Sequence, residues 1–450
     1  MKLISRLICL LLIMVPLSAC GSDKGGTIRT VNINGVEKQV VKLAAITRSD
    51  SWLPKVIADF NENNLNYHVE VSYFLSATRG IVSRDAYAEA LAEAVLQLNI
   101  ELAAGDVPDI VLFPGQSQTN GYITKGLFAD LNEYVESDPE FDRADYLPYL
   151  FETFDRDSRM YEISPLFTMN VILTKAADVG SDAAWTLDEF VAYIESKPDA
   201  RYILGDLTKR DFIVKMSQFL FVNLVAGEVK FDRDEFKKIL RIAEYFPIDL
   251  PDDYDNLFGY EEFMKGAKGG DPLMVPRTIQ GFLGPKYSGH LFFGAEVTMK
   301  GWPSAANNGI LLTSPGYFSI MKHAENPIGA WAFLKYALNH AECRNKSLMP
   351  VNIARLNQMA EDEHNTWSSI EENPNRTADW VVEISKGYSK ADNDNFFALY
   401  ESASTLDRED PVISRIIDEE IGGYISGQRP IDTVIDIIEN RIALYLAEQH

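Results

Sequence analysis

The sequence has few cysteines and few positive charges. Only three of its 450 residues are cysteines, Cys9, Cys20 and Cys343, which excludes a fold held together by several disulfides. Lys and Arg total 42 against 66 Asp and Glu, so the net charge is −24. A nucleic-acid partner requires clustered Lys and Arg to contact its phosphates, and this charge balance therefore argues against one.

The motifs of common enzyme and metal sites are also missing. The six histidines show no HxxxH spacing and the cysteines are not paired, so the sequence predicts no metal site. Neither a GxSxG motif nor a phosphate-binding glycine loop occurs. The acidic stretch at Pro251–Asn256 does not continue as a calcium loop, because Leu257 and Phe258 take the places of a ligand and a glycine. We therefore expect no catalytic residue and no cofactor.

Long apolar runs are missing after residue 20, where no stretch approaches the roughly 20 residues that a membrane-spanning helix needs. The one pronounced run, Leu7–Val15, follows Lys2 and Arg6 and is succeeded by small residues. This arrangement is typical of a secretory signal peptide, which we assign to residues 1–19. The rest of the chain is expected to be a soluble body outside the cytoplasm.

A cysteine stands where the signal peptide ends. The stretch LSAC, Leu17 to Cys20, is similar to the lipobox of bacterial lipoproteins at every position. The resemblance implies cleavage before Cys20 and lipidation of its sulfur with diacylglycerol, so that acyl chains such as palmitate hold the protein at the cell membrane. Residues 20–40 would be the anchor and tether. An ordinary signal peptide that happens to end near a cysteine is the alternative, and Cys343 is expected to be a buried apolar side chain.

The segments after the tether alternate between strand and helix patterns. Val40–Ile46 and Tyr67–Phe74 have strand patterns, and a helix with Pro54 in its first turn is predicted between them. A second helix, Ala86–Ala104, leads to a buried type of strand at Pro108–Phe113. This order predicts βαβ units and an α/β fold with parallel-rich sheets flanked by helices.

Signals further along the chain continue the alternation. The stretch Met160–Lys175 has two strand-like runs on either side of PLFTM, and Val297–Trp302 is a further strand pattern. Thr186 and Glu189 form a capping box before a helix. Asn326 followed by Pro327 marks the start of another helix, and the last helix begins at Pro430.

Taken together, the order of the segments resembles the extracellular solute-binding proteins of ABC importers, in particular the large carbohydrate-type family. Five stretches carry the resemblance: LAAGDVPDIVLF at 102–113, GLFADLNEYVESD at 126–138, MYEISPLFTMNVILTKAADVG at 160–180, GILLTSPGYFSIMKHAENPIGAWAFLKYAL at 309–338, and YISGQRPIDTVIDIIENRIALYLAE at 424–448. They extend over almost the whole chain after the leader. The sequence TSPGY departs from the family pattern, since many members have a glycine-rich turn there.

The resemblance implies a periplasmic-binding-protein-like fold (type II) with two lobes and a cleft between them. Chain crossings between the lobes are expected near Leu166–Asn170, Gly294–Thr298 and Pro350. Lobe 1 would contain residues 41–166 and 299–349, and lobe 2 residues 167–298 and 350–450. A solute would hold the lobes closed because it touches both of them only in that form, and ABC permease subunits would then recognise the closed form.

The loops after the strands supply the candidate ligand-binding residues, because ligands of open α/β sheets lie beyond the carboxyl ends of the strands. A sugar needs aromatic surfaces for its C–H faces and polar groups for its hydroxyls. On these grounds the candidates are Asp50, Trp52, Gln116, Asn120, Phe167, Asn170, Trp302 and Tyr317. Each has a structural alternative: Asp50 as a helix cap, and the aromatic side chains as packing.

Three functions remain compatible with these observations. The leading hypothesis is a monomeric receptor at the extracytoplasmic face of the cell membrane that binds a mono- or oligosaccharide for an ABC importer. The second is a surface glycosidase or lyase, which would need two carboxylates at a fixed separation across a pocket. The third is a ligand sensor that acts on a membrane kinase through the same fold.

Overall fold

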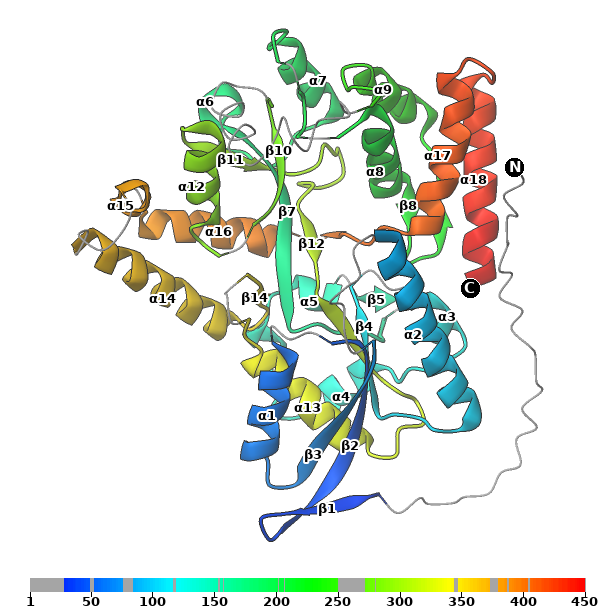
Figure 1. Cartoon of the computed structure of the whole chain (residues 1–450), viewed down its shortest axis with the longest axis vertical. Coiled ribbons are helices and arrows are strands. Elements are labelled where there is room, and N and C mark those ends of the chain that lie inside the picture. Colours follow the sequence, from blue (N-terminus) through cyan, green and yellow to red (C-terminus); the bar gives the residue numbers. More distant parts are fainter. Residues whose placement is uncertain are drawn as a thin grey trace.

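The computed structural model describes most of the chain after its N-terminal segment. The described residues are 28–48, 52–75, 84–115, 119–152, 154–156, 158–200, 202–205, 207–249, 272–279, 281–343, 347–372, 379–386, 388–403 and 405–449. Cys20, Asp50 and Gln116 lie outside these ranges. The described part forms two lobes, one above the other in Figure 1.

Lobe 1 is built on a five-stranded sheet of order β1-β2-β4-β13, with β3 paired to β2. β2, β3 and β4 are parallel to one another, whereas β1 and β13 are antiparallel to their neighbours. The βαβ units predicted from the sequence are therefore confirmed. The strands are β1 (Thr30–Ile33), β2 (Val36–Thr47), β3 (Tyr67–Leu75), β4 (Ile110–Pro114) and β13 (Gly316–Ile320).

Helices cover this sheet, and α13 illustrates how one is fixed at its start. The Asn326 side chain accepts a hydrogen bond from the Gly329 amide at 3.0 Å, with Pro327 in the first turn, as predicted. The buried Asp109 carboxylate accepts from the amides of Lys42 and Asn326, which joins sheet and helix. The helices of lobe 1 are α1 (Leu53–Asn63), α2 (Arg84–Ala104), α3 (Asn120–Thr124), α4 (Leu131–Ser137), α5 (Tyr149–Glu152) and α13 (Pro327–His340), with a 3₁₀ turn at Arg143–Asp145 and a hairpin of β5 (Asp155–Arg156) and β6 (Arg159–Met160).

Lobe 2 contains a six-stranded sheet centred on β7 (Leu166–Lys175). All of its pairings with β7 are antiparallel, and only β12 and β15 run parallel. Two predictions are therefore corrected: the sheet is not parallel-rich, and PLFTM does not separate two strands. β7 is buried on both faces, so one central strand accommodates the whole apolar run. Its partners are β10 (Val275–Ile279), β11 (Val297–Lys300), β12 (Leu311–Thr313), β14 (Met349–Pro350) and β15 (Thr405–Leu406).

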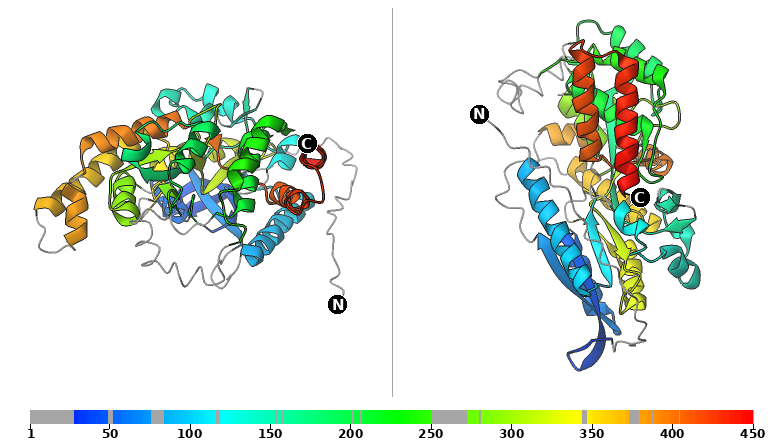
Figure 2. Two further views of the ribbon diagram at one scale, coloured as in Figure 1. Left: turned by 90° about the horizontal axis from the view of Figure 1, so that it is seen from above. Right: turned by 90° about the vertical axis from the view of Figure 1, so that its right-hand side faces the viewer.

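The helices of lobe 2 pack on both sides of this sheet (Figure 2). The predicted capping box of Thr186 and Glu189 is present at the start of α7. The predicted C-terminal helix is α18, which packs against α17. The elements are α6 (Ala176–Val179), α7 (Leu187–Glu195), α8 (Lys209–Phe221), α9 (Arg233–Ala243), α12 (Gly284–Ser288), a π-helical turn (Gly289–Phe293), α14 (Ile353–Glu372), α15 (Asp379–Lys386), α16 (Lys390–Ser402), α17 (Pro411–Ile425) and α18 (Ile431–Gln449), with a hairpin of β8 (Val222–Asn223) and β9 (Glu228–Val229).

The chain crosses between the sheets at three adjacent places. Ser164 and Ser314, both buried, share a hydrogen bond of 2.7 Å between their hydroxyls just before β7 and β13. Pro350 pairs with Leu166 at the start of β7. The second crossing differs from the expected position near Gly294–Thr298, because β11 and β12 both pair with β7 and the first sheet is re-entered only at Gly316.

Close packing continues through these crossings. One apolar cluster joins the sheet of lobe 1 to β7 and to the helices near α16, and a second lies between β7 and helices α7, α8, α9, α17 and α18. Cys343 is buried, as expected, and forms no disulfide within the described residues. Within the described ranges no helix combines the length and apolarity needed to span a bilayer.

Candidate functional site

The carboxyl ends of the parallel strands of lobe 1 point toward lobe 2 (Figure 1). β2 ends at Thr47, β3 at Leu75 and β4 at Pro114. In open α/β sheets this edge is where ligands bind. The predicted residues Asp50 and Gln116 follow two of these ends and lie outside the described residues.

A cavity of about 620 Å³ lies between the lobes. Its size falls in the range of small-molecule pockets, roughly 300–1,000 Å³. Lobe 1 contributes Glu152 and Asp155. Lobe 2 contributes the other described lining residues, from α8, the β8–β9 hairpin and the residue after it, β12, β15 and the segment after β15. Movement of the lobes about the three crossings would therefore change its shape.

Lys215 of α8 stands at the floor of this cavity between two carboxylates. Its ammonium donates to Asp407 Oδ1 and to Glu409 Oε1, each at 2.6 Å. Burial alone would lower the pKa of Lys215, but the charges and hydrogen bonds of the two carboxylates outweigh burial and raise the pKa. Lys215 is therefore a fixed cation at neutral pH.

Asn170, a predicted ligand residue, belongs to the polar network beside this lysine. It lies near the middle of β7, where its amide group donates to Thr313 Oγ1 at 2.7 Å and to Asp407 Oδ2 at 2.8 Å. Its carbonyl oxygen accepts from the Thr278 hydroxyl at 2.7 Å. Asn170 therefore orients Asp407 toward Lys215 and links three strands of the lobe 2 sheet.

A buried charge cluster connects the lobes on the other side of Asp407. Both terminal nitrogens of Arg408, from lobe 2, donate to Glu162 Oε2 of lobe 1 at 3.1 Å. Arg156 lies 3.9 Å from the same carboxylate, and Thr119 donates to it at 2.7 Å. Burial lowers the pKa of Arg156, whereas for Arg408 the charge of Glu162 outweighs burial and the pKa is raised.

Asn120, another predicted ligand residue, also bridges the lobes. Its amide group donates to the Leu224 carbonyl in the β8–β9 turn at 2.8 Å, and its own oxygen accepts from Arg156 at 2.7 Å. Helix α18 contacts α3 nearby. The lobes therefore touch beside the cavity, and Asn120 belongs to their contact.

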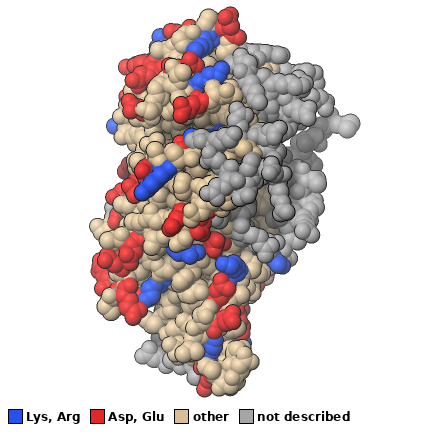
Figure 3. Space-filling view, turned by 90° about the vertical axis from the view of Figure 1, so that its left-hand side faces the viewer, with Lys and Arg blue, Asp and Glu red and all other residues tan. Residues whose placement is uncertain are grey.

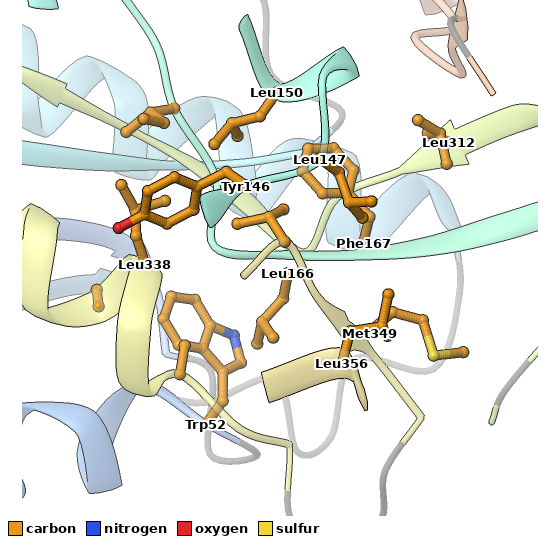
Figure 4. Packing of buried hydrophobic residues seen from close by; sticks show 14 of the residues in the cluster. Trp52, Tyr146, Leu147, Leu150, Leu166, Phe167, Leu312, Leu338, Met349 and Leu356 are labelled. Atoms are coloured by element: carbon orange, nitrogen blue, oxygen red, sulfur yellow. The ribbon is translucent and has the colours of Figure 1, made fainter. Parts of the chain in front are cut away.

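Three predicted ligand aromatics are placed in the core instead. Trp52 and Tyr317 pack edge-on against Phe318 and Phe154 with ring centroids 5.8 and 5.3 Å apart, and Phe167 lies 5.4 Å from the Tyr149 ring. All three side chains are essentially inaccessible. Figure 4 shows Trp52 and Phe167 among apolar side chains that include Leu147, Leu166 and Leu338. Rings enclosed in this way offer no face to a solute. The prediction that these three side chains contact a ligand is therefore wrong, and they pack in the core instead.

Trp302 is buried as well, but it lies next to the polar network. The residue is 5% exposed, and the Lys215 ammonium lies 5.4 Å from the centroid of its ring. The backbone of Gly309 packs directly against the backbone of Trp302, because a Cβ atom at Gly309 would lie only 1.9 Å from the Trp302 carbonyl oxygen. Trp302 therefore packs against Lys215. The lysine covers the ring face that was expected to contact a sugar.

Sequence reasoning missed the charged residues of the site: Lys215, Asp407, Arg408, Glu409 and Glu162. The sequence contained a signal for two parts of this site, Lys215 and the stretch from Asp407 to Glu409. Lys215 interrupts the apolar run FIVKMSQFLF, and the acidic-basic alternation DRED directly follows the short strand β15. Nothing in the sequence indicates the contact between Arg408 and Glu162, which lie 246 positions apart.

A second cavity, of about 890 Å³, lies within lobe 2 between α12, β11 and α16. All of its described lining residues come from one lobe, so closure of the lobes would leave it unchanged. In the described part of the chain no group of three or more His, Cys, Asp or Glu side chains could hold a metal ion. The interlobe cavity is thus the candidate site.

The described residues form two lobes that three adjacent chain crossings join, with a cavity between the lobes. Residues 44–197 match the family model of bacterial extracellular solute-binding proteins. The resemblance to this class of protein is therefore confirmed: the family model covers the chain from within β2 to just after α7. No curated protein sequence matches the chain.

Several solved structures share the fold over nearly their full length. An oligogalacturonide-binding protein from Yersinia enterocolitica is 14% identical, with 91% of this chain and 99% of that one covered and a TM-score of 0.58. The sugar-binding protein MalE from Xanthomonas citri is 14% identical, with 91% and 98% covered and a TM-score of 0.53. An ABC substrate-binding protein from Listeria monocytogenes in complex with cycloalternan is 14% identical, with 91% and 99% covered and a TM-score of 0.50. At this identity the likeness establishes the fold.

Proposed function

We propose that the protein is a lipid-anchored extracytoplasmic receptor that binds a mono- or oligosaccharide between its lobes and delivers it to an ABC permease. The interlobe cavity carries the proposal, because polar side chains from both lobes line it and three chain crossings join the lobes. The lipobox-like stretch at Cys20 supports the anchor, which would hold the protein near the permease.

The nature of the solute is supported by the lining and by the similar proteins. Ammonium, carboxylate and amide groups converge on the cavity, and a polyhydroxylated solute can hydrogen-bond to all of them. The three similar structures described above are proteins that their descriptions connect with sugars or ABC import. Contacts of a solute with both lobes would stabilise the closed form that a permease recognises.

Binding without turnover is the favoured activity. The matching family is one of solute-binding proteins, and the similar structures are mostly binding proteins, although two designed esterases are also among them. Among the described carboxylates that line the cavity, the least exposed is Asp407, and it is held by Lys215 and Asn170. Receptor function requires no further chemistry.

A thermal-shift screen with a panel of glycans tests the proposal. A few sugars are expected to raise the melting temperature increasingly with sugar concentration, because a ligand that binds only the native state adds stability that grows with the logarithm of its concentration above the Kd. Each stabilising sugar should be recovered intact after prolonged incubation, as measured by chromatography. Consumption of the sugar would establish an enzyme instead, and the absence of any shift across the panel would rule out sugars as the solute class.

A further inference from the structure

The floor of the interlobe cavity has a specific donor and acceptor pattern. The ammonium of Lys215 lies between Asp407 and Glu409, and its side chain is only 14% exposed. Asp407 is fixed from the other side by Asn170 at 2.8 Å. Trp302 lies under the ammonium, so the lysine has little freedom to move. We call Lys215, Asp407 and Glu409 the floor triad.

The floor triad has hydrogen-bonding capacity left for a solute. An ammonium has three N–H donors, and the two carboxylates use two of them. Each carboxylate accepts up to about four hydrogen bonds. Glu409, with a side chain 44% exposed, has no partner besides Lys215 in the part of the chain that the structure describes. One donor flanked by carboxylate acceptors therefore remains available.

The charges of the triad leave one negative charge uncompensated, since one cation stands between two anions. Beyond the triad, the neighbouring cluster of Arg408, Arg156 and Glu162 carries one net positive charge. The cavity walls add the carboxylates of Glu152, Asp155 and Glu228 and the ammonium of Lys230, which is two net negative charges, so the charged side chains around the cavity remain net negative. Acidic side chains, with basic ones among them, are also spread over the face shown in Figure 3.

We propose that the floor triad recognises adjacent free hydroxyls of an uncharged sugar and discriminates against sugars that carry a carboxylate. A hydroxyl can accept from Lys215 and at the same time donate to Asp407 or Glu409, so two neighbouring hydroxyls match the pattern. A carboxylate has no proton to donate and is repelled by the net negative triad. This inference rests on the proposed function and narrows its solute class.

Matched sugar pairs that differ only in a carboxylate test the discrimination. Tetramers of galactose and of galacturonate, and tetramers of glucose and of glucuronate, would be titrated calorimetrically at low salt. In at least one pair the neutral member is expected to bind about tenfold more tightly than its uronate. Glu409→Gln should reduce the ratio of the affinities for the neutral sugar and its uronate about threefold or more, because it removes one negative charge. Glu62→Gln, an exposed position on α1 remote from the cavity, makes the same change in net charge and should leave the preference unaltered.

The outcomes separate this inference from the proposed function. A uronate that binds as tightly as its neutral partner, or more tightly, would overturn the inference while the receptor function stands. An equal effect of Glu62→Gln and Glu409→Gln would also overturn it, because overall charge and not the triad would then set the preference. Failure of every sugar to bind would overturn the proposed function itself.

Discussion

At the scale of single residues, Glu162 has the most consequential position. Its side chain is 3% exposed and faces Arg408 and Arg156, whose side chains are 10% and 12% exposed. Arg408 also stands over the Tyr317 ring at 4.1 Å. One buried carboxylate therefore balances two buried guanidinium groups that approach it from different lobes.

Glu162→Gln should destabilise the protein by about 3 kcal/mol or more, because it leaves buried cations without a counter-charge. Urea denaturation at pH 7 would measure the free energy of unfolding. Asp418→Asn is the matched control, since Asp418 pairs with Arg210 at 3.1 Å on the surface and exposed pairs contribute about 0–1 kcal/mol. Equal effects of the two substitutions would contradict this account of the buried cluster.

At the scale of elements, side-chain bridges join segments that the sequence predicts only one at a time. Asp138 follows α4 and accepts hydrogen bonds from Trp331 Nε1 at 2.9 Å and from Lys335 of α13, with an ion-pair distance of 2.8 Å. Burial alone would raise the pKa of Asp138, but these hydrogen bonds and the lysine charge outweigh burial and lower the pKa. The ionised carboxylate therefore attaches α4 to α13.

The stability contributed by Asp138 should depend on pH. Its pKa is lower in the folded than in the unfolded chain, so the contribution is complete above the unfolded pKa of about 3.9 and is lost as the pH falls through the folded pKa. Asp138→Asn should cost about 1 kcal/mol at pH 7 and less at pH 3, measured by urea denaturation. Glu140→Gln, at an exposed partner of the same lysine, should cost little at either pH. A cost of Asp138→Asn that is independent of pH would contradict the assignment.

At the scale of the whole molecule, a small number of contacts hold the lobes together beside the cavity. The Asn120 side-chain amide donates a hydrogen bond to the Leu224 carbonyl of the opposite lobe at 2.8 Å. A hydrogen bond between the lobes favours the closed form, and it therefore contributes to the affinity for any solute that the closed form binds.

Asn120→Ala should weaken binding of the stabilising sugar about fivefold, the equivalent of one hydrogen bond of roughly 1 kcal/mol. Calorimetric titration would give the affinity, and small-angle X-ray scattering should show a larger radius of gyration than in the unaltered protein without sugar. Asn63→Ala, an exposed position near the end of α1, is the control. An unchanged affinity and radius would show that this contact does not help to close the lobes.

The sequence by itself determined the order of elements in lobe 1, the helix starts at Thr186 and Asn326, and the resemblance to solute-binding proteins. These features depend on local patterns, namely apolar periodicity and capping residues, that neighbouring positions carry. Only the tertiary structure decided which side chains face the cavity. Trp52 and Phe167 are enclosed by segments distant in the chain, and Glu162 meets Arg408 across 246 positions. Burial and charge pairing depend on which distant segments pack together, and no local pattern of residues specifies that.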